Sequence, residues 1–405
     1  MLIMMKIVFA EFPETKASLK WFSLYSPSIL WPLYGVSIYE VLSVLNMDVQ
    51  LFLNDSSRTS IWSRRFKIKI TDKVSDEALV VNSRIYGDLK TFLDLLDELS
   101  NLDYKDDTLF TIGGSPAFIY TPSGLSGSDF SKLLNNIMKR RLNIGDLYVY
   151  EHPWDLLRYF LTLDLNKNLE LVKDLFGFEE IRRGVYALGD VEIDDRYTYV
   201  DTSDGPILIF EEVNFEGFNV LKGPLILGSN TLLSNSKVYH SIIGPVCKIG
   251  SEVGDSLILG YSNSAHHGYI GHSLVGYWVN IGAGTIFSDL KNTYGGMRVK
   301  FMGKTFDLGT IKFGSVVGDY VKISINTSIY GGKIIGLSSH VSGLISGNVE
   351  PFTIYDGWRD ISEDMHIEKA VEIAERMYRR RGVKLLDGEE ELFRKVFQEL
   401  REFPT

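Results

Sequence analysis

Cysteine is nearly absent from this chain of 405 residues, in which Cys247 is the only one. A single cysteine excludes an internal disulfide and indicates a reducing compartment, so we expect a cytoplasmic protein. No apolar run approaches the ~20 residues that a membrane-spanning helix needs. The apolar opening Met1–Met5 is interrupted by Lys6 without a cleavage-site pattern, which predicts a first strand rather than a signal peptide.

Clustered positive charge is also missing. The net charge is −10, and no basic stripe with interleaved aromatic residues occurs, which argues against a nucleic-acid partner. A short basic run, Arg379–Arg381, ends a predicted helix, where cations favour the helix dipole. Apolar residues make up 45% and charged residues 23%, a profile typical of soluble globular proteins, and the length predicts two or three domains.

Residues 1–150 have the pattern of an α/β domain. Helix-like stretches such as Leu89–Leu102 alternate with short β-rich runs, and this alternation predicts a mostly parallel sheet. The β-rich runs are Lys6–Phe9, Val49–Leu53, Ala78–Val81 and Leu109–Ile112. A helical pattern from Pro153 to Leu175 predicts a bridging helix within a linker at 151–217.

After about residue 218, aliphatic residues recur every six positions. One series is Val220, Ile226, Leu232 and Val238, another is Ile311, Val317, Ile323, Ile329, Ile335 and Val341, and Ile243, Ile249, Ile270, Val275 and Ile281 lie between them. This hexapeptide repeat is typical of a parallel β-helix with three flat sides and an 18-residue coil, whereas a β-sandwich has a period of two. The pattern predicts a β-helix at 218–350. A helical tail at 351–405 should cap its open end or pack against a neighbouring subunit.

A polar segment from Phe287 to about Thr310 breaks the repeat. It follows the stretches His266–Gly271 and Val279–Thr285, and Lys312 stands where the repeat resumes. A long loop that leaves a regular solenoid next to such residues is typical of a functional site. Histidine suits the removal of a proton near neutral pH. We therefore expect an acid–base site with a mobile loop that closes over an acceptor.

The stretch His266–Thr285 resembles the acetyltransferase half of the bifunctional N-acetylglucosamine-1-phosphate uridyltransferase/glucosamine-1-phosphate acetyltransferase family. That family has His-x-x-Tyr-aliphatic-Gly followed by Asn-Ile-Gly-Ala-Gly-Thr. A divergent branch is closer still, through the runs Gly260–His266, Ser288–Gly295 and Gly318–Thr327. The resemblance covers about residues 240–345. It implies a Rossmann-like nucleotidyltransferase-like domain, a left-handed parallel β-helix with C-terminal helices, and a homotrimer with acetyl-CoA as co-substrate.

The resemblance also implies a role for each matching residue. His266 matches the general base that deprotonates the sugar amine, and Lys312 matches a lysine that pairs with the acceptor phosphate. The remaining matches are Tyr269, Asn280, Asp289 and Asn292 for acceptor binding, and Ala283 and Asn326 for acetyl-CoA. The family's common Asn-Tyr pair is replaced here by Asp289-Leu290, so the acceptor contacts differ.

The first domain lacks the glycine-rich loop that holds nucleotide phosphates in this family, and Phe9–Lys16 stands in its place. Without that loop, Lys16, Lys20 or Arg84 would have to neutralise a triphosphate. Asp88, Asp106 and Asp107 could supply the carboxylates that Mg²⁺ needs, but no spacing selects among them. Two alternatives stay open for this domain. It either forms UDP-N-acetylglucosamine by nucleotidyl transfer or keeps only the fold of such an enzyme.

Two other functions remain as alternatives. One is a non-catalytic protein that binds a sugar nucleotide or acts as a scaffold. The other is a zinc β-helix hydratase, since His267 and His272 lie five apart with His240 and His266 nearby. The long polar loop and the Gly-Ala-Gly-Thr run fit an acyltransferase better. We therefore expect no metal in the β-helix, ligands that are sugar phosphates and nucleotides, and no membrane partner.

Overall fold

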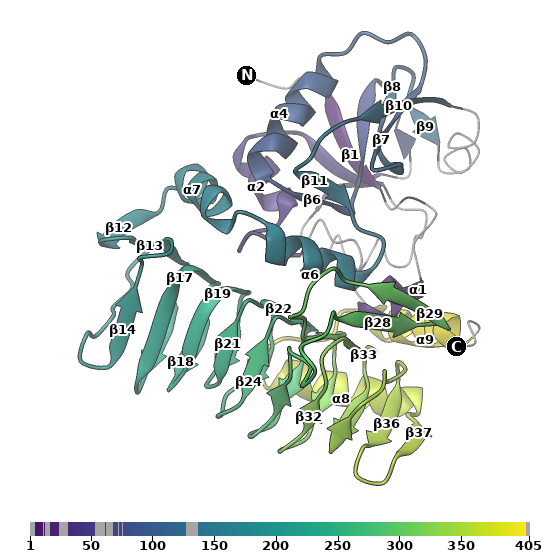
Figure 1. The fold of residues 1–405 in the computed structure, drawn as a ribbon. Coiled ribbons are helices and arrows are strands. Elements are labelled where there is room, and N and C mark those ends of the chain that lie inside the picture. Colours follow the sequence, from purple (N-terminus) through teal and green to yellow (C-terminus); the bar gives the residue numbers. More distant parts are fainter. Residues whose placement is uncertain are drawn as a thin grey trace.

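The computed structural model describes residues 5–10, 12, 17–23, 31–52, 61, 68–71, 73–74, 76–126 and 137–401. An N-terminal α/β domain stands on one side of a long solenoid of parallel strands, and two C-terminal helices run beside that solenoid (Figure 1). No helix in these ranges is long and apolar enough to span a bilayer.

The N-terminal domain contains one seven-stranded sheet of order β10-β7-β8-β5-β1-β2-β3. Its strands are β1 (Lys6–Ala10), β2 (Val49–Phe52), β3 (Ile70–Thr71), β5 (Ala78–Asn82), β7 (Thr108–Ile112), β8 (Ser115–Thr121) and β10 (Met138–Leu142). All neighbours are parallel except β8, which runs antiparallel to β5 and β7. Gly113 and Gly114, both with positive φ, make the tight turn into β8. The predicted α/β domain is confirmed.

Short elements complete this domain. They are α1 (Ala17–Phe22), α2 (Ile38–Val44), α4 (Leu89–Ser100), and the strand pairs β4 (Lys73–Val74) with β9 (Leu125–Ser126) and β6 (Ile85–Gly87) with β11 (Leu147–Val149). Asp88 caps α4 by accepting a 2.8 Å hydrogen bond from the Thr91 N–H. Apolar residues at helical spacing bury one side of α4.

The predicted bridging helix is two helices, α6 (Pro153–Thr162) and α7 (Leu165–Phe176). Leu163 is extended, with ψ of 137°, and Asp164 starts α7 by accepting a hydrogen bond from the Lys167 N–H. An aspartate at this position favours a new helix start over continuation. One continuous helix was therefore wrong.

Parallel strands build three faces of the solenoid. The first face holds β14 (Thr198–Asp201), the first parts of β17 (Asn219–Leu227) and β19 (Lys237–Ile243), β21 (Glu252–Gly254), β24 (Tyr269–Gly271), β27 (Ile286–Phe287), β32 (Ser328–Ile329) and β35 (Leu344–Ile345). The second face holds β13 (Val185–Ala187), β15 (Ile207–Ile209), the last parts of β17 and β19, β22 (Leu257–Gly260), β25 (Leu274–Tyr277), β30 (Ser315–Val317) and β33 (Lys333–Ile335).

The third face holds β16 (Asn214–Glu216), β18 (Leu232–Ser234), β20 (Lys248–Ile249), β23 (Asn263–Ser264), β26 (Asn280–Ile281), β31 (Lys322–Ile323), β34 (His340–Ser342) and β36 (Thr353–Asp356). Antiparallel strands close the two ends, β12 (Glu179–Arg182) on β13 and β37 (Ile361–Asp364) on β36. The predicted β-helix fold is confirmed. Its ladders begin at β13, so they reach well before the predicted start at residue 218.

The hexapeptide register was correct in most of the solenoid and wrong at two places. Ile323 pairs with Val341, which is the 18-residue coil, and both are buried. Leu221, Leu227 and Leu233 fill the first coils instead of the predicted Val220, Ile226 and Leu232. Ile226 faces outward but is buried beneath the N-terminal domain, so aliphatic residues occupy both alternating positions there. Ile311, predicted inside, is 52% exposed.

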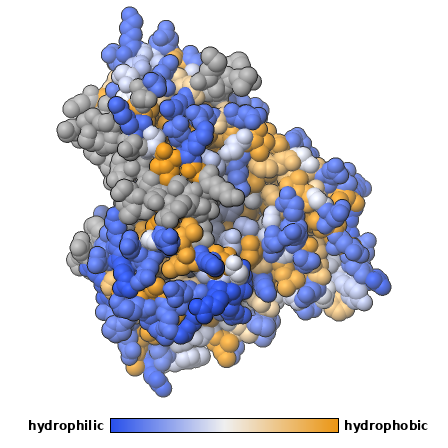
Figure 2. Space-filling view, turned by 180° about the vertical axis from the view of Figure 1, so that it is seen from behind, coloured by the Kyte–Doolittle hydropathy of each residue, from blue (hydrophilic) through white to orange (hydrophobic). Residues whose placement is uncertain are grey.

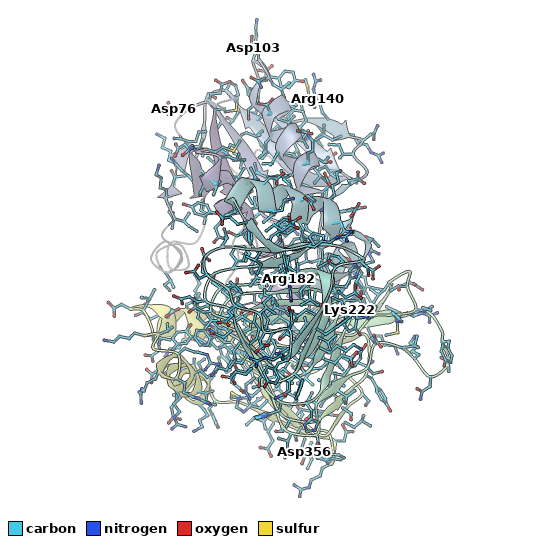
Figure 3. All side chains as sticks on the ribbon, turned by 90° about the vertical axis from the view of Figure 1, so that its left-hand side faces the viewer. Asp76, Asp103, Arg140, Arg182, Lys222 and Asp356 are labelled. Carbon is cyan, nitrogen blue, oxygen red and sulfur yellow. The ribbon has the colours of Figure 1, made fainter. Side chains whose placement is uncertain are left out.

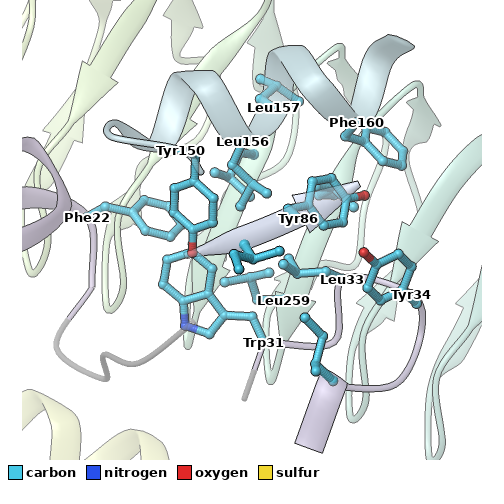
Figure 4. Close-up of a cluster of buried hydrophobic side chains, with 14 of the residues drawn as sticks. Phe22, Trp31, Leu33, Tyr34, Tyr86, Tyr150, Leu156, Leu157, Phe160 and Leu259 are labelled. Carbon is cyan, nitrogen blue, oxygen red and sulfur yellow. The ribbon is translucent and has the colours of Figure 1, made fainter. Parts of the chain in front are cut away.

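The N-terminal domain and the solenoid share one apolar core. Trp31 packs against Phe22 and Tyr150, with ring centroids 5.3 and 6.3 Å apart, and Leu259 of β22 belongs to the same cluster (Figure 4). The backbone N–H of Asp319 in the solenoid also donates to the carbonyl of Phe22 in α1. These contacts fix the domain against the second face.

The segment that leaves the repeat ends in a hairpin of β28 (Arg298–Phe301) and β29 (Lys304–Asp307). Phe301 packs edge-on against Trp21 at 4.9 Å, and Phe306 packs against His152 at 4.9 Å. These aromatic contacts attach the hairpin to the N-terminal domain, and closure of the segment over an acceptor stays a prediction.

The C-terminal helices α8 (Ile367–Arg379) and α9 (Glu389–Arg401) lie along the solenoid rather than over its end. Tyr378 packs against Trp278 at 4.4 Å, and Phe393 packs against Tyr320 at 4.9 Å. Figure 3 looks along the solenoid and shows these helices on one side, a pale green loop on the other and the N-terminal domain above.

Candidate functional site

The outer side of the third face carries a row of polar side chains. Strand pairing aligns Lys248, Asn263, Asn280, Lys322 and His340 on successive coils. The residues after them, such as Ile249, Ile281 and Ile323, point into the core, because side chains alternate along a strand. The third face therefore presents one regular polar ladder.

A stacked corner borders this ladder, between the third and first faces. The Gly284 N–H donates to the His267 carbonyl, and the Asn326 N–H donates to the Ala283 carbonyl, both at 2.8 Å. Gly284 has φ of 75°, and a Cβ there would lie 2.1 Å from the Asn326 Oδ1. Glycine thus lets three coils stack closely at the Gly-Ala-Gly-Thr run.

A groove of about 500 Å³ runs between this corner and the polar ladder, and we call it the third-face groove. It is lined by Lys248, Asn263, Ala265, His266, Asn280, Ile281, Gly282, Ala283, Ile325, Arg380 and Arg381. Three predicted site residues, His266, Asn280 and Ala283, therefore meet in one place. His266 is exposed and directly precedes the corner residue His267. Asn326 lies one coil further on and directly follows the lining residue Ile325.

Two further titratable groups of the ladder are desolvated. Burial lowers the pKa of Lys322 to about 7, and its Nζ donates to the carbonyls of Tyr320 at 2.7 Å and Trp278 at 2.9 Å. Burial and the nearby charges of Lys322 and Lys369 lower the pKa of His340 to about 4. At neutral pH, His340 is therefore uncharged.

A second cluster lies at the opposite edge of the first face, and we call it the first-face network. His272 Nδ1 lies 2.7 Å from Asp289 Oδ2, and the Tyr269 hydroxyl donates to that same oxygen at 2.9 Å. His272 Nε2 lies 3.8 Å from Asp255 Oδ2, and His240 Nδ1 lies 2.7 Å from Asp255 Oδ1. Two carboxylates thus alternate with two imidazoles.

Contacts within the first-face network shift the pKa values of its members. Burial raises the pKa of Asp289, but the contacts from His272 and Tyr269 more than offset this, so its pKa lies below the ordinary value. Burial and the Asp289 carboxylate raise the pKa of Tyr269. The contact with Asp255 raises the pKa of His240. Asp289 is thus held ionised and Tyr269 is held protonated.

The remaining predicted residues lie apart from the third-face groove. Tyr269 and Asp289 belong to the first-face network, and Asn292 lies exposed in the expelled segment. Lys312 is exposed and forms an antiparallel bridge with Leu290, next to that network. Within one subunit, the predicted base and the predicted phosphate-binding lysine are therefore on opposite edges of the first face.

The zinc alternative receives no support from the described residues. Among them, no three His, Cys, Asp or Glu side chains converge as metal ligands. His267 is exposed at the third-face corner, whereas His272 is in the first-face network. These two histidines lie at opposite edges of the first face, because strand β24 runs between them.

In the N-terminal domain, the candidate residues serve the fold where the structure describes them. Asp88 caps α4 and pairs with Lys167 at 2.9 Å, and Lys20 pairs with Glu399 at 3.3 Å. Arg84 is buried and donates to the Tyr150 carbonyl at 3.4 Å. Asp106 and Asp107 precede β7, and Lys16 lies outside the described residues. Among the described residues, these carboxylates do not form a cluster of three metal ligands.

Sequence reasoning missed two groups that the structure brings to the sites. Arg380 and Arg381 line the third-face groove, although their run was interpreted as a helix end. Asp255 joins His240 to His272. Residue spacing could have indicated the second group, because Asp255 and His240 occupy equivalent corners of successive coils.

No family model matches the chain. A bifunctional sugar-1-phosphate nucleotidylyltransferase/acetyltransferase of Sulfurisphaera tokodaii is 33% identical over 104 residues, which is 25% of this chain and 26% of that protein. A bifunctional protein GlmU of Methanococcus maripaludis strain C5 is 26% identical over 233 residues, or 54% of this chain and 51% of that protein.

Among solved structures, the polySia-specific acetyltransferase NeuO is 13% identical with a TM-score of 0.25, covering 44% of this chain and 97% of its own. That score is too low to carry an argument, and the strand pairing establishes the fold. The matched segments span about a quarter to a half of the curated relatives. Over that extent, the resemblance to the bifunctional sugar-phosphate family is confirmed.

Proposed function

We propose that the β-helix transfers an acetyl group from acetyl-CoA to the amine of an amino-sugar 1-phosphate. The observation that carries this proposal is the third-face groove, where His266 meets Asn280 and Ala283 of the following coil. The names of the sequence relatives, which include an acetyltransferase activity, support it.

The chemistry follows from the residues present. An amine attacks a thioester only when it is unprotonated, so a base must remove a proton before or during attack. The imidazole of His266 is exposed to the groove and can accept that proton. Asn280 can hydrogen bond the acceptor, and the backbone beside Ala283 can contact the acetyl group. Acetyl transfer then breaks the thioester, forms the amide and releases CoA thiol.

Nucleotidyl transfer is the second activity that the relatives' names bring to this chain. We derive no step for it, because the described carboxylates of the N-terminal domain are engaged in the fold or lie apart. Pyrophosphate release from UTP, Mg²⁺ and a sugar 1-phosphate would measure it. The homotrimer, with sites completed by a neighbouring subunit, and the cytoplasmic location also stay predictions.

The test is a thioester-consumption assay with acetyl-CoA and a panel of amino sugars with and without a 1-phosphate. We expect thiol release with at least one phosphorylated amino sugar, and mass spectrometry should find the N-acetyl product in equal amount. Absence of thiol release with every acceptor would overturn the proposal in favour of a non-catalytic binding protein.

A further inference from the structure

The basic pair Arg380 and Arg381 reaches the third-face groove because the tail folds back along the solenoid. Tyr378, which is 1% exposed, packs on Trp278 and shares a hydrogen bond with the Tyr320 hydroxyl. Three residues later, the Arg381 guanidinium donates to the Asn263 Oδ1 on the polar ladder. The tail is therefore anchored where it crosses the groove.

The pair has no carboxylate partner among the described residues, unlike three other arginines of the tail. Arg376 pairs with Glu372, Arg394 with Glu368 at 2.9 Å, and Arg401 with Asp364 at 2.8 Å. By contrast, Arg381 meets a neutral amide, and burial and the charge of Arg380 lower its pKa.

The groove itself is cationic. Lys248, Arg380 and Arg381 line it together with His266, and no Asp or Glu does. Seen from behind, the surface at the lower left, where α8 and α9 lie, is mainly hydrophilic (Figure 2). Uncompensated cations beside a concave surface attract an anion, and a guanidinium fork matches the geometry of phosphate.

We propose that Arg380 and Arg381 bind a phosphate group of a ligand whose reacting end lies at His266. This inference rests on the proposed acetyl transfer. It assigns phosphate recognition to the C-terminal tail, whereas the sequence assigned it to Lys312. Both the acceptor 1-phosphate and the phosphates of acetyl-CoA have the required chemistry.

Steady-state kinetics of Arg380→Gln, Arg381→Gln and the double variant distinguish these two sources. Losing a charge-assisted contact should raise one KM by ~10–100-fold and leave kcat little changed. A rise confined to the phosphorylated acceptor identifies the acceptor, and a rise confined to acetyl-CoA identifies the donor. Arg376→Gln is the matched control. Arg376 lies in α8, just before the pair, and does not line the groove, so its loss should leave both KM values unchanged.

Equilibrium binding separates this proposal from the proposed function. The wild-type protein and the double variant are titrated with glucosamine 1-phosphate and, separately, with coenzyme A. Binding that the double variant loses supports the phosphate site, even if no thioester is consumed. Equal behaviour of the two proteins towards both probes, including no binding by either, overturns it. Thermal unfolding that matches Arg376→Gln excludes misfolding as the cause.

Discussion

At the scale of single residues, His240, Asp255 and His272 occupy equivalent corners of three successive coils, and the carboxylate of Asp255 contacts both histidines. His272 is the more enclosed, with a side chain 13% exposed against 51% for His240, and it touches a second carboxylate on Asp289. Because the corner recurs in every coil, residues far apart in the chain come to lie next to each other. A β-helix can thus form a network of charged side chains that no local sequence motif indicates.

This stacking predicts a pH dependence at His240. Its pKa is raised by Asp255, so the ion pair stabilises the fold fully below the ordinary histidine pKa of ~6.5 and loses that contribution as the pH rises through the folded-state value. An NMR titration should find the pKa above ~6.5, and Asp255→Asn should bring it back. Asp204→Asn, which removes a more distant charge, should change it little. An unchanged pKa in Asp255→Asn would contradict the pairing.

At the scale of elements, the hairpin β28–β29 joins the expelled segment to the N-terminal domain. Phe301 is 6% exposed and contacts Trp21 of α1 and Trp154 of α6, so two helices hold the hairpin in place. The preceding stretch, Lys291–Tyr294, is exposed. We expect a response to a ligand in this first part of the segment rather than in the hairpin.

Truncating the anchor should release the hairpin. Phe301→Ala removes a buried aromatic ring, which costs about 3–5 kcal/mol in a well-packed site. We expect faster amide exchange throughout Arg298–Asp307, measured by mass spectrometry. Met302→Ala is the control, because Met302 is 42% exposed at the turn. Exchange in Phe301→Ala as slow as in the control would show that the hairpin does not depend on this contact.

How far the sequence predicts these elements depends on what the outer face of each strand meets. Where the outer face is polar, as at Lys322–Ile323, the six-residue period identifies the inward residue. Where the N-terminal domain covers the outer face, as at Ile226, both positions are aliphatic and the register is lost. The corner residues of the groove were predictable from local motifs. Arg380 and Arg381 were not, because only tertiary packing of the tail brings them there.

At the scale of the whole molecule, the first face exposes apolar side chains to solvent. Ile286 and Leu344 lie on the same outward row as Tyr269 and are 42% and 37% exposed, and Tyr330 beside them is 51% exposed. The other two faces are partly covered, the second by the N-terminal domain and the third by the tail. Among the described residues, the first face is therefore the least covered side of the solenoid.

This exposure accords with the predicted homotrimer, in which cyclic symmetry would bury all three first faces. Sedimentation equilibrium at micromolar concentration should give three times the chain mass. A double variant, Ile286→Asp with Leu344→Asp, should sediment as a monomer, because a charge buried in an interface is costly. Ile361→Asp, at the exposed end strand β37, should remain a trimer. A wild-type monomer would refute the prediction.

Acetyl transfer in the third-face groove is tested most directly by the kinetics of His266→Ala beside His267→Ala. Both histidines are exposed at the same corner, but only His266 lines the groove. Loss of a general base should lower kcat by ~10²–10⁴-fold in His266→Ala and leave KM nearly unchanged. His267→Ala should behave as wild type. A near-normal kcat in His266→Ala, together with loss of turnover in His272→Ala, would contradict the groove and move the chemistry to the first-face network.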